Sequence, residues 1–413
     1  MPATAFARSR DFWKHLGWGL ASGMLGAIGA FVFLGLMNLG LSLVWPDPPG
    51  PEPFSGSWQI VAIMTAAGLI VGLIRHFVQV KDADVFTAII KGHMETRPIP
   101  GALLIALTSL IGGFSLGPEV PTGMGGAALG TWLSERRKLS DESERVNVMS
   151  GVMGAYGGLF SSPFAATMVP LEVTHTQSPA YYGTIIIGAA AAVFGFVLFF
   201  IQAGDQFSPL LRFLDLPVYD LKVWHIAMAL VFGIVGAILA VIFGLLLRIF
   251  KRLATPLVSR PILLSTLAGL LLGLLGLALP LTLFLGTDGL VTVTTQGAQL
   301  GAALLAVVVL AKLVALSGAL AGGFIGGPIF PLLFAGGTTG VVINLLFPSI
   351  PLALSVSCMM AALPGAILPI PLTLSIIVLL ITGVPPTEVI PVVVAALTSY
   401  FITHGLGLIA QEG

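Results

Sequence analysis

The chain consists of long apolar segments that very few charged side chains interrupt. Lys and Arg number 18 and Asp and Glu another 18 among 413 residues, together 9%, against about 25% in an ordinary soluble protein. A soluble domain cannot cover its surface with so few charges, and a disordered chain would lack the apolar runs. The sequence therefore predicts an all-α membrane protein that crosses the bilayer many times.

The apolar segments differ in length, which indicates that they are not all simple membrane spans. Residues 371–383, as a helix, would cover only about 20 Å, against a hydrocarbon core of about 30 Å. Short segments interrupted by Gly and Pro predict half-helices, whose freed backbone groups must lie against protein or a water-filled cavity. The segments lie at roughly 17–45, 57–78, 99–117, 118–133, 146–160, 163–173, 183–202, 223–250, 261–285, 298–319, 328–347, 350–363, 371–383 and 386–403.

The charged residues gather between these segments and predict the loops. Arg8, Arg10 and Lys14 precede the first segment, and such positive charges favour a cytoplasmic N-terminus. The connection 205–222 is the expected linker between two membrane halves, 1–204 and 223–413. The formal net charge is zero, so no nucleic-acid partner is expected. We also expect no soluble regulatory domain, cofactor or metal.

The two halves contain the same motif. The residues of 112–130 and 322–340, compared at an offset of 210, are identical at 8 of 19 positions, and the identities include Phe114/Phe324 and both prolines of each motif. A second correspondence follows downstream, where Pro163 matches Pro371 at an offset of 208. Duplicated halves with helix breaks at matching positions are typical of transporters, whose binding site lies at the repeat interface.

Each motif reads as the N-terminus of a helix that begins inside the membrane. Pro118 and Pro328 suit the first turn of a helix, and the preceding glycines allow the chain to turn sharply. Helix N-termini carry unpaired N–H groups and about half a positive charge. Two such ends that converge form an anion site without Lys or Arg.

Glu119 is the acid that this pattern places at the start of the first of these helices. An ionisable residue inside a membrane segment is by default a functional candidate. Its carboxylate would compete with a permeant anion for the same N–H groups, and protonation would release it. The alternative is an acid that only stabilises its own helix.

These residues resemble the CLC family of chloride channels and anion/proton antiporters, in a divergent prokaryotic branch. The first motif is similar to the family's G-(K/R)-E-G-P sequence, and the second is similar to its G-x-F-x-P region. The element order is similar over roughly 16–403. The residues that carry the resemblance are Gly117-Pro118-Glu119-Val120-Pro121, Phe160-Ser161-Ser162-Pro163-Phe164-Ala165 and Gly326-Gly327-Pro328-Ile329-Phe330-Pro331.

The resemblance implies a double inverted repeat of tilted and broken helices and a homodimer in the inner (plasma) membrane. It also implies one pathway for a small monovalent anion in each subunit, with chloride as the expected ion. It makes Glu119 the gating glutamate, with protons as a second permeant species in antiporters. The anion-binding backbone amides that it implies are those of Gly117, Glu119, Val120, Ile329 and Phe330.

The sequence departs from the family at other pathway positions. The loop 80–87 contains no serine, which leaves the Thr87 hydroxyl as a substitute anion ligand, and Tyr400 falls early for the family's C-terminal tyrosine. The family's internal proton glutamate aligns with Val173, and Glu172 lies one position before it. A valine there is typical of channels, so we favour passive conduction slightly over proton-coupled antiport.

Two further residues have open interpretations. Lys312 either attracts anions at a vestibule or extends its amine to an interface. Tyr156 either faces the pathway or packs against neighbouring helices, and packing is the more common role of an intramembrane tyrosine. Two other classes of function are disfavoured. A membrane-embedded enzyme needs a nucleophile–base pair or a metal cluster, and a cation-coupled transporter of another fold usually needs several buried acids.

Overall fold

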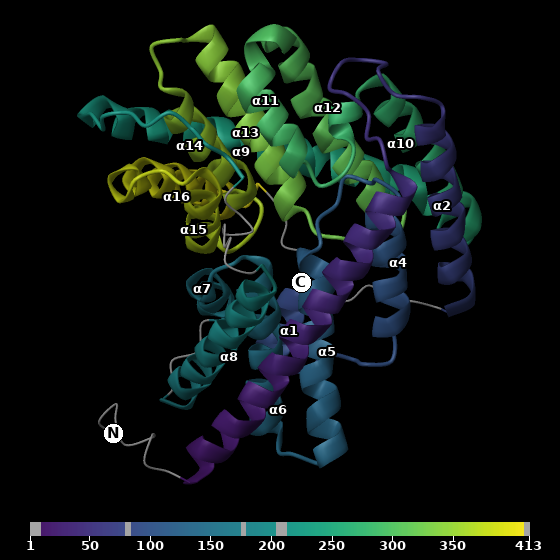
Figure 1. Cartoon of the computed structure of the whole chain (residues 1–413), viewed down its shortest axis with the longest axis vertical. Helices are drawn as coiled ribbons and strands as arrows, with labels where there is room; N and C mark the ends of the chain where they lie inside the picture. The colour runs from purple at the N-terminus through teal and green to yellow at the C-terminus, as the bar shows by residue number, and fades with distance from the viewer. Residues whose placement is uncertain (1–9, 79–83, 175–178, 204–212, 409–413) are drawn as a thin grey trace. The chain divides into compact units, whose positions relative to one another are not determined.

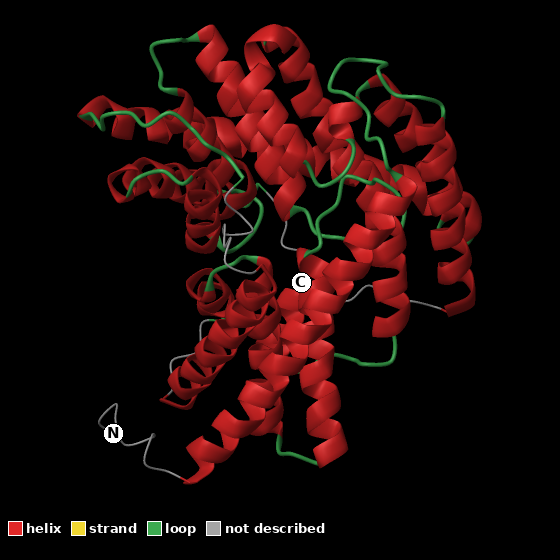
Figure 2. Cartoon of the chain, in the orientation of Figure 1, coloured by secondary structure: helices red, strands yellow, loops and turns green. Residues whose placement is uncertain are grey.

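The computed structural model describes residues 10–78, 84–174, 179–203 and 213–408. These residues form α-helices and short 3-10 helices joined by loops, with one isolated bridge between two extended residues (Figure 2). The all-α fold class predicted from the sequence is therefore confirmed. The α-helices are α1 Arg10–Val44, α2 Gln59–Val78, α3 Val85–Lys91, α4 Ile99–Ile111, α5 Glu119–Arg137, α6 Asp141–Leu159, α7 Pro163–Val173, α8 Pro179–Ala203, α9 Val223–Ala254, α10 Pro261–Ala278, α11 Thr287–Leu300, α12 Ala302–Ala321, α13 Ile329–Leu346, α14 Leu352–Gly365, α15 Pro371–Thr382 and α16 Val389–Gly405.

The membrane character of the chain is also confirmed. Among the described residues, seven helices are long and apolar enough to cross a bilayer. Four further apolar helices, α4, α14, α15 and α16, are shorter than a span requires. The predicted segment 371–383 is one of these, because its helix ends at Thr382 and Gly383 follows in a left-handed conformation.

The chain forms two compact units, each made of separate stretches of sequence. The first unit contains the residues of Met1–Met37, Gln79–Leu104 and Pro118–Leu211, and the second contains those of Asn38–Val78, Ile105–Gly117 and Arg212–Gly413. In the first unit α6 packs against α5, α7 and α8, and α3 lies against α5. In the second unit α2 packs along α10, α13 lies between α12 and α14, and α9 contacts α16 (Figure 1).

Helix pairs at equivalent positions of the repeat are in backbone contact. In α5 and α6, a Cβ at Gly126 would overlap the carbonyl oxygen of Gly151, so only glycine fits there. In α13 and α14, a Cβ at Gly336 would overlap the carbonyl oxygen of Met359 in the same way. Gly126 and Gly336 are 210 positions apart, and their contact partners Gly151 and Met359 are 208 positions apart. These are the offsets found in the sequence, so the double repeat is present in the packing.

Candidate functional site

The loops that open the two copies of the motif, 112–117 and 322–327, form one connected structure inside the second unit. Gly117 and Gly327 exchange two backbone hydrogen bonds, N–H to carbonyl in both directions, and each is 2.7 Å long. The rings of Phe114 and Phe324 stack, with centroids 3.8 Å apart. We call these two contacts together the motif bridge. Residues that are 210 positions apart in the sequence thus meet as symmetric partners.

The residue before each stacked phenylalanine has a backbone conformation that requires glycine. Gly113 has φ = +85° and Gly323 has φ = +87°, a region that side chains strongly disfavour. The carbonyl of Gly113 accepts a hydrogen bond from Phe284 N at 2.9 Å, and that of Gly323 accepts one from Arg75 Nε at 2.6 Å. Each motif loop is therefore fixed to the surrounding protein at the same position.

A helix begins two residues after each glycine of the motif bridge. The first hydrogen bond within α5 runs from Thr122 N to Pro118 O, and the first within α13 runs from Leu332 N to Pro328 O; both are 3.0 Å. Helix geometry supplies no acceptor for N–H groups that precede these bonds. Each proline is the residue before the helix rather than its first residue, one position earlier than predicted.

Glu119 is the first residue of α5, and only 1% of it is exposed. Its backbone carbonyl accepts hydrogen bonds from the Tyr156 hydroxyl at 3.0 Å and from Thr122 Oγ1 at 3.1 Å. A Cβ at Gly123 would overlap the Tyr156 hydroxyl, so the glycine one turn into α5 makes room for this contact. Tyr156, which the sequence presented as a packing residue, thus also anchors the helix start. Tyr156 and Glu119 are 37 positions apart, and no pattern in the sequence signals this contact.

The structure gives Gly117 and Thr87, two of the predicted anion ligands, other hydrogen-bond partners. The N–H of Gly117 donates to Gly327 in the motif bridge. The Thr87 hydroxyl donates to Asp84 Oδ2 at 2.6 Å, and the same carboxylate caps α3 through Phe86 N and Thr87 N. Positions 80–83 of the predicted 80–87 loop lie outside the described residues.

The remaining pathway candidates lie on separate helices. Glu172 is half-buried on α7, and Val173 next to it is buried. Tyr400 is half-buried on α16 and stacks on His404, with ring centroids 4.2 Å apart. Val120 in α5 and Phe330 in α13 are the second residues of their helices, where backbone N–H groups precede the first intrahelical bond.

Lys312 is fully buried in α12 and its amine faces the backbone. Nζ donates to the carbonyls of Thr282 at 3.2 Å, Leu283 at 2.9 Å and Phe284 at 2.8 Å. It also lies 4.9 Å from the centre of the Phe334 ring. A lysine ammonium has three N–H donors, so these carbonyls match its full donor capacity. Lys312 thereby fixes the loop whose Phe284 N–H holds Gly113.

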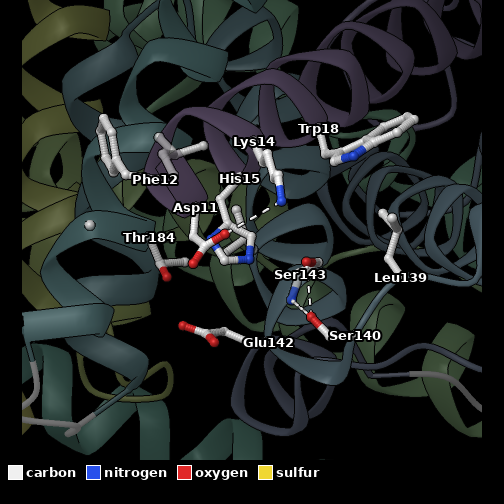
Figure 3. Close-up of a pocket in the computed structure, with 13 residues that line it drawn as sticks. Asp11, Phe12, Lys14, His15, Trp18, Leu139, Ser140, Glu142, Ser143 and Thr184 are labelled. Atoms are coloured by element: carbon white, nitrogen blue, oxygen red, sulfur yellow. Dashed lines mark hydrogen bonds and ion pairs between the residues drawn. The ribbon is translucent and has the colours of Figure 1, made fainter. Parts of the chain in front are cut away.

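A polar cavity of about 600 Å³ lies at the N-terminal end of α1 and shares no residue with the motifs. Figure 3 shows the charged side chains of α1 facing the start of α6 across it. Lys14 pairs with Asp11 at 3.6 Å, and Ser140 caps α6 by accepting from Ser143 N at 3.4 Å. Both contacts stay within one helix or its cap.

The all-helical double repeat, with a helix start at equivalent positions of its two halves, has the architecture of a membrane transport protein. The family model of the voltage gated chloride channel matches residues 64–404. The chain belongs to this family, which confirms the resemblance carried by the two motifs. Members of the family transport anions.

Related proteins and solved structures agree with this assignment. The chain is 28% identical over 357 residues to the "Putative ion-transport protein YfeO" of Escherichia fergusonii, covering 82% of this chain and 81% of the relative. It is also 28% identical over 358 residues to the protein of that name from Escherichia coli strain K12.

Two solved structures share the fold. A slow cyanobacterial Cl⁻/H⁺ antiporter matches 97% of this chain and 95% of its own, with a TM-score of 0.77 and 20% identity. A CLC-type fluoride/proton antiporter matches 95% and 94%, with a TM-score of 0.72 and 20% identity.

Proposed function

We propose that this protein conducts a small monovalent anion through a pathway that Glu119 gates, and that this anion is chloride. The observation that carries the proposal is the pair of helix starts, each two residues beyond a glycine of the motif bridge. The backbone N–H groups of Glu119 and Val120 in α5, and of Ile329 and Phe330 in α13, are the proposed anion donors. Such donors attract an anion without the cost of burying a cation at bilayer depth.

Glu119 supplies the gate because its carboxylate competes with the anion for donors at the same helix start. When the side chain is ionised it occupies these groups, and when it is protonated it leaves them to the anion. Gly117 is not included among the donors, because its N–H is bonded to Gly327.

A channel is the favoured mode of transport, and a proton-coupled antiporter is the alternative. Val173 at the family's internal proton position favours passive conduction. The alternative is supported by Glu172 beside it on α7, half-buried, and by the two antiporters that share the fold.

The test is a flux assay on purified protein in liposomes, with an imposed chloride gradient and simultaneous recording of internal pH. A channel passes chloride without proton movement, whereas an antiporter drives protons against their gradient. Protein-free liposomes are the control. If chloride, nitrate, bromide and fluoride all fail to move, the proposed function is wrong.

Orientation and assembly are separate proposals. Arg8, Arg10 and Lys14, which precede the apolar run of α1, support a cytoplasmic N-terminus in the inner membrane, and family membership supports a homodimer. The division into repeat halves at 205–222 also remains a proposal, and part of this linker lies outside the described residues. Labelling of single introduced cysteines from each side of the membrane tests the orientation.

A further inference from the structure

An apolar groove of about 310 Å³ lies inside the first unit, between α1, α4 and α5. We call it the acyl groove and define it by six of its lining residues, Gly29, Phe33, Thr96, Leu103, Gly125 and Trp132. The hydroxyl of Thr122, which also borders it, is bonded to the carbonyls of Pro118 and Glu119. The groove wall is therefore almost entirely hydrocarbon.

The surroundings of the acyl groove indicate what fills it. The outer face of α1 exposes Ile28, Val32 and Leu36, and α1 is one of the membrane-spanning candidates. In a bilayer such a face contacts lipid tails rather than water. An unfilled apolar groove forfeits dispersion contacts along its lining, and a hydrocarbon chain restores them.

A lining residue of the groove holds a cation close to it. Trp132 lines the groove, is 43% exposed, and carries the Arg136 guanidinium 5.6 Å from its ring centre. Tryptophan is enriched at membrane–water interfaces, and the planar guanidinium binds phosphate in a bidentate manner. A cation suited to a phosphodiester thus lies beside the apolar groove.

We propose that the acyl groove binds one chain of an anionic phospholipid, whose phosphate is held by Arg136. The first turn of α5 forms part of the groove wall, since Pro121 and Thr122 border the groove. The bound lipid therefore touches the helix that begins at Glu119. The site stands independently of the transported ion, because it is defined by lipid binding and not by flux.

A substitution at Gly125 can fill the groove selectively. A Cβ at this position would find its nearest atom, Leu103 Cδ1, at 4.0 Å, so a larger side chain has room to extend from this groove-lining position. Gly35 on α1 is a matched control, because a Cβ there meets nothing within 4 Å and the residue is exposed and outside the groove. Gly125→Leu blocks the site, and Gly35→Leu adds the same side chain to a lipid-facing surface elsewhere.

The experiment is photo-crosslinking of the full chain in vesicles that contain a trace of phosphatidylglycerol with a diazirine in its acyl chain. Digestion and mass spectrometry then locate the labelled peptides. We expect label on the groove residues of α1, α4 and α5, at least five-fold less in Gly125→Leu, and no change in Gly35→Leu. Equal labelling of Gly125→Leu, or protein–protein crosslinks through this face, would overturn the proposal.

Arg136→Gln tests the headgroup contact and also serves if Gly125→Leu does not fold. Arg136 is exposed, so its replacement removes charge without opening a buried space. In Arg136→Gln, labelling by the phosphatidylglycerol probe should fall several-fold. In the unmodified protein, a phosphatidylcholine probe with the same acyl chain should label the groove less than the phosphatidylglycerol probe does. Labelling by phosphatidylglycerol that Arg136→Gln leaves unchanged would rule out the phosphate contact, and equal labelling of the unmodified protein by both lipids would rule out the preference for an anionic lipid.

Discussion

At the scale of single residues, Glu119 was the clearest prediction from the sequence, because an acid inside an apolar segment is rare. The structure places it at the start of α5 with 1% exposure. Its anchor Tyr156 was not predictable as such, because the contact joins two helices through a backbone carbonyl and leaves no pattern in the sequence. Lys312 is similar: the sequence left a vestibule or an interface open for its amine, whereas the structure buries it against three carbonyls whose position depends on the path of a distant loop.

Replacement of Glu119 by glutamine should remove most of the pH dependence of anion flux. Glutamine mimics the protonated side chain and cannot compete as an anion, so flux near pH 7.5 should approach the level that the unmodified protein reaches near pH 4.5. Proteoliposome flux across this range is the measurement. Glu142→Gln, an exposed acid at the start of α6, should leave the pH profile unchanged. A profile in Glu119→Gln that still rises steeply with acid would remove this residue from the gate.

Replacement of Lys312 by methionine should destabilise the protein by about 3 kcal/mol. Methionine keeps the apolar stem but leaves three carbonyls without their donor, and each buried unsatisfied group costs about 1–3 kcal/mol before relaxation. Thermal unfolding in detergent, followed by tryptophan fluorescence, measures the change. Lys14→Met removes an exposed lysine and should cost under about 0.5 kcal/mol. If Lys312→Met and Lys14→Met had the same melting temperature, the three hydrogen bonds from Lys312 to the loop would not stabilise the fold.

Glu388 should make stability depend on pH. It is buried outside the membrane-spanning helices, and its Oε1 accepts from Tyr219 N at 3.5 Å. Burial raises the pKa of Glu388 above its ordinary value of 4.5, although the Tyr219 hydrogen bond opposes this. The folded state then keeps a proton that the unfolded state releases, so this contribution to stability is lost as pH rises above about 4.5. Melting temperatures against pH should decline less in Glu388→Gln, whereas exposed Glu52→Gln should follow the unmodified protein.

At the scale of elements, the apolar segments predicted most helices, and 163–173 matches α7 at both ends. The sequence missed α3 and α11 as helices. α3 is only seven residues long, and α11 contains four threonines, Asp288 and Gln296 among its apolar positions. Hydropathy does not detect such helices, because their stability comes from capping and packing. The segment 99–117 was predicted as continuous, but α4 ends at Ile111 and the motif loop follows.

Two neighbouring glycines of α5 should respond in opposite ways to alanine. Gly126→Ala places a methyl group against the carbonyl of Gly151 in α6, and we expect a loss of about 3 kcal/mol from the forced separation of the helices. Gly125→Ala meets no atom closer than 4.0 Å and should gain up to about 1 kcal/mol from helix propensity. Melting temperatures of the two variants give the comparison. Similar values for both would show that α5 and α6 are not held in backbone contact.

At the scale of the whole molecule, the sequence predicted the repeat but not the compact units. Residues 105–117 belong to the second unit, although the chain continues directly into the first at Pro118. Local patterns identify where a helix breaks, whereas the assignment of each piece to a packing unit depends on contacts between residues far apart in sequence. The motif bridge is an example, because it joins positions 210 apart.

The motif bridge also has a consequence for ancestry. Gly117 and Gly327 exchange the same pair of bonds and Phe114 meets its own counterpart Phe324, so the contact is isologous, as in a C₂ dimer. Two identical half-length chains can form such a contact with each other. We therefore infer that gene duplication and fusion enclosed a homodimer interface within one polypeptide. A single-motif half-chain that remains strictly monomeric in membranes would count against this origin.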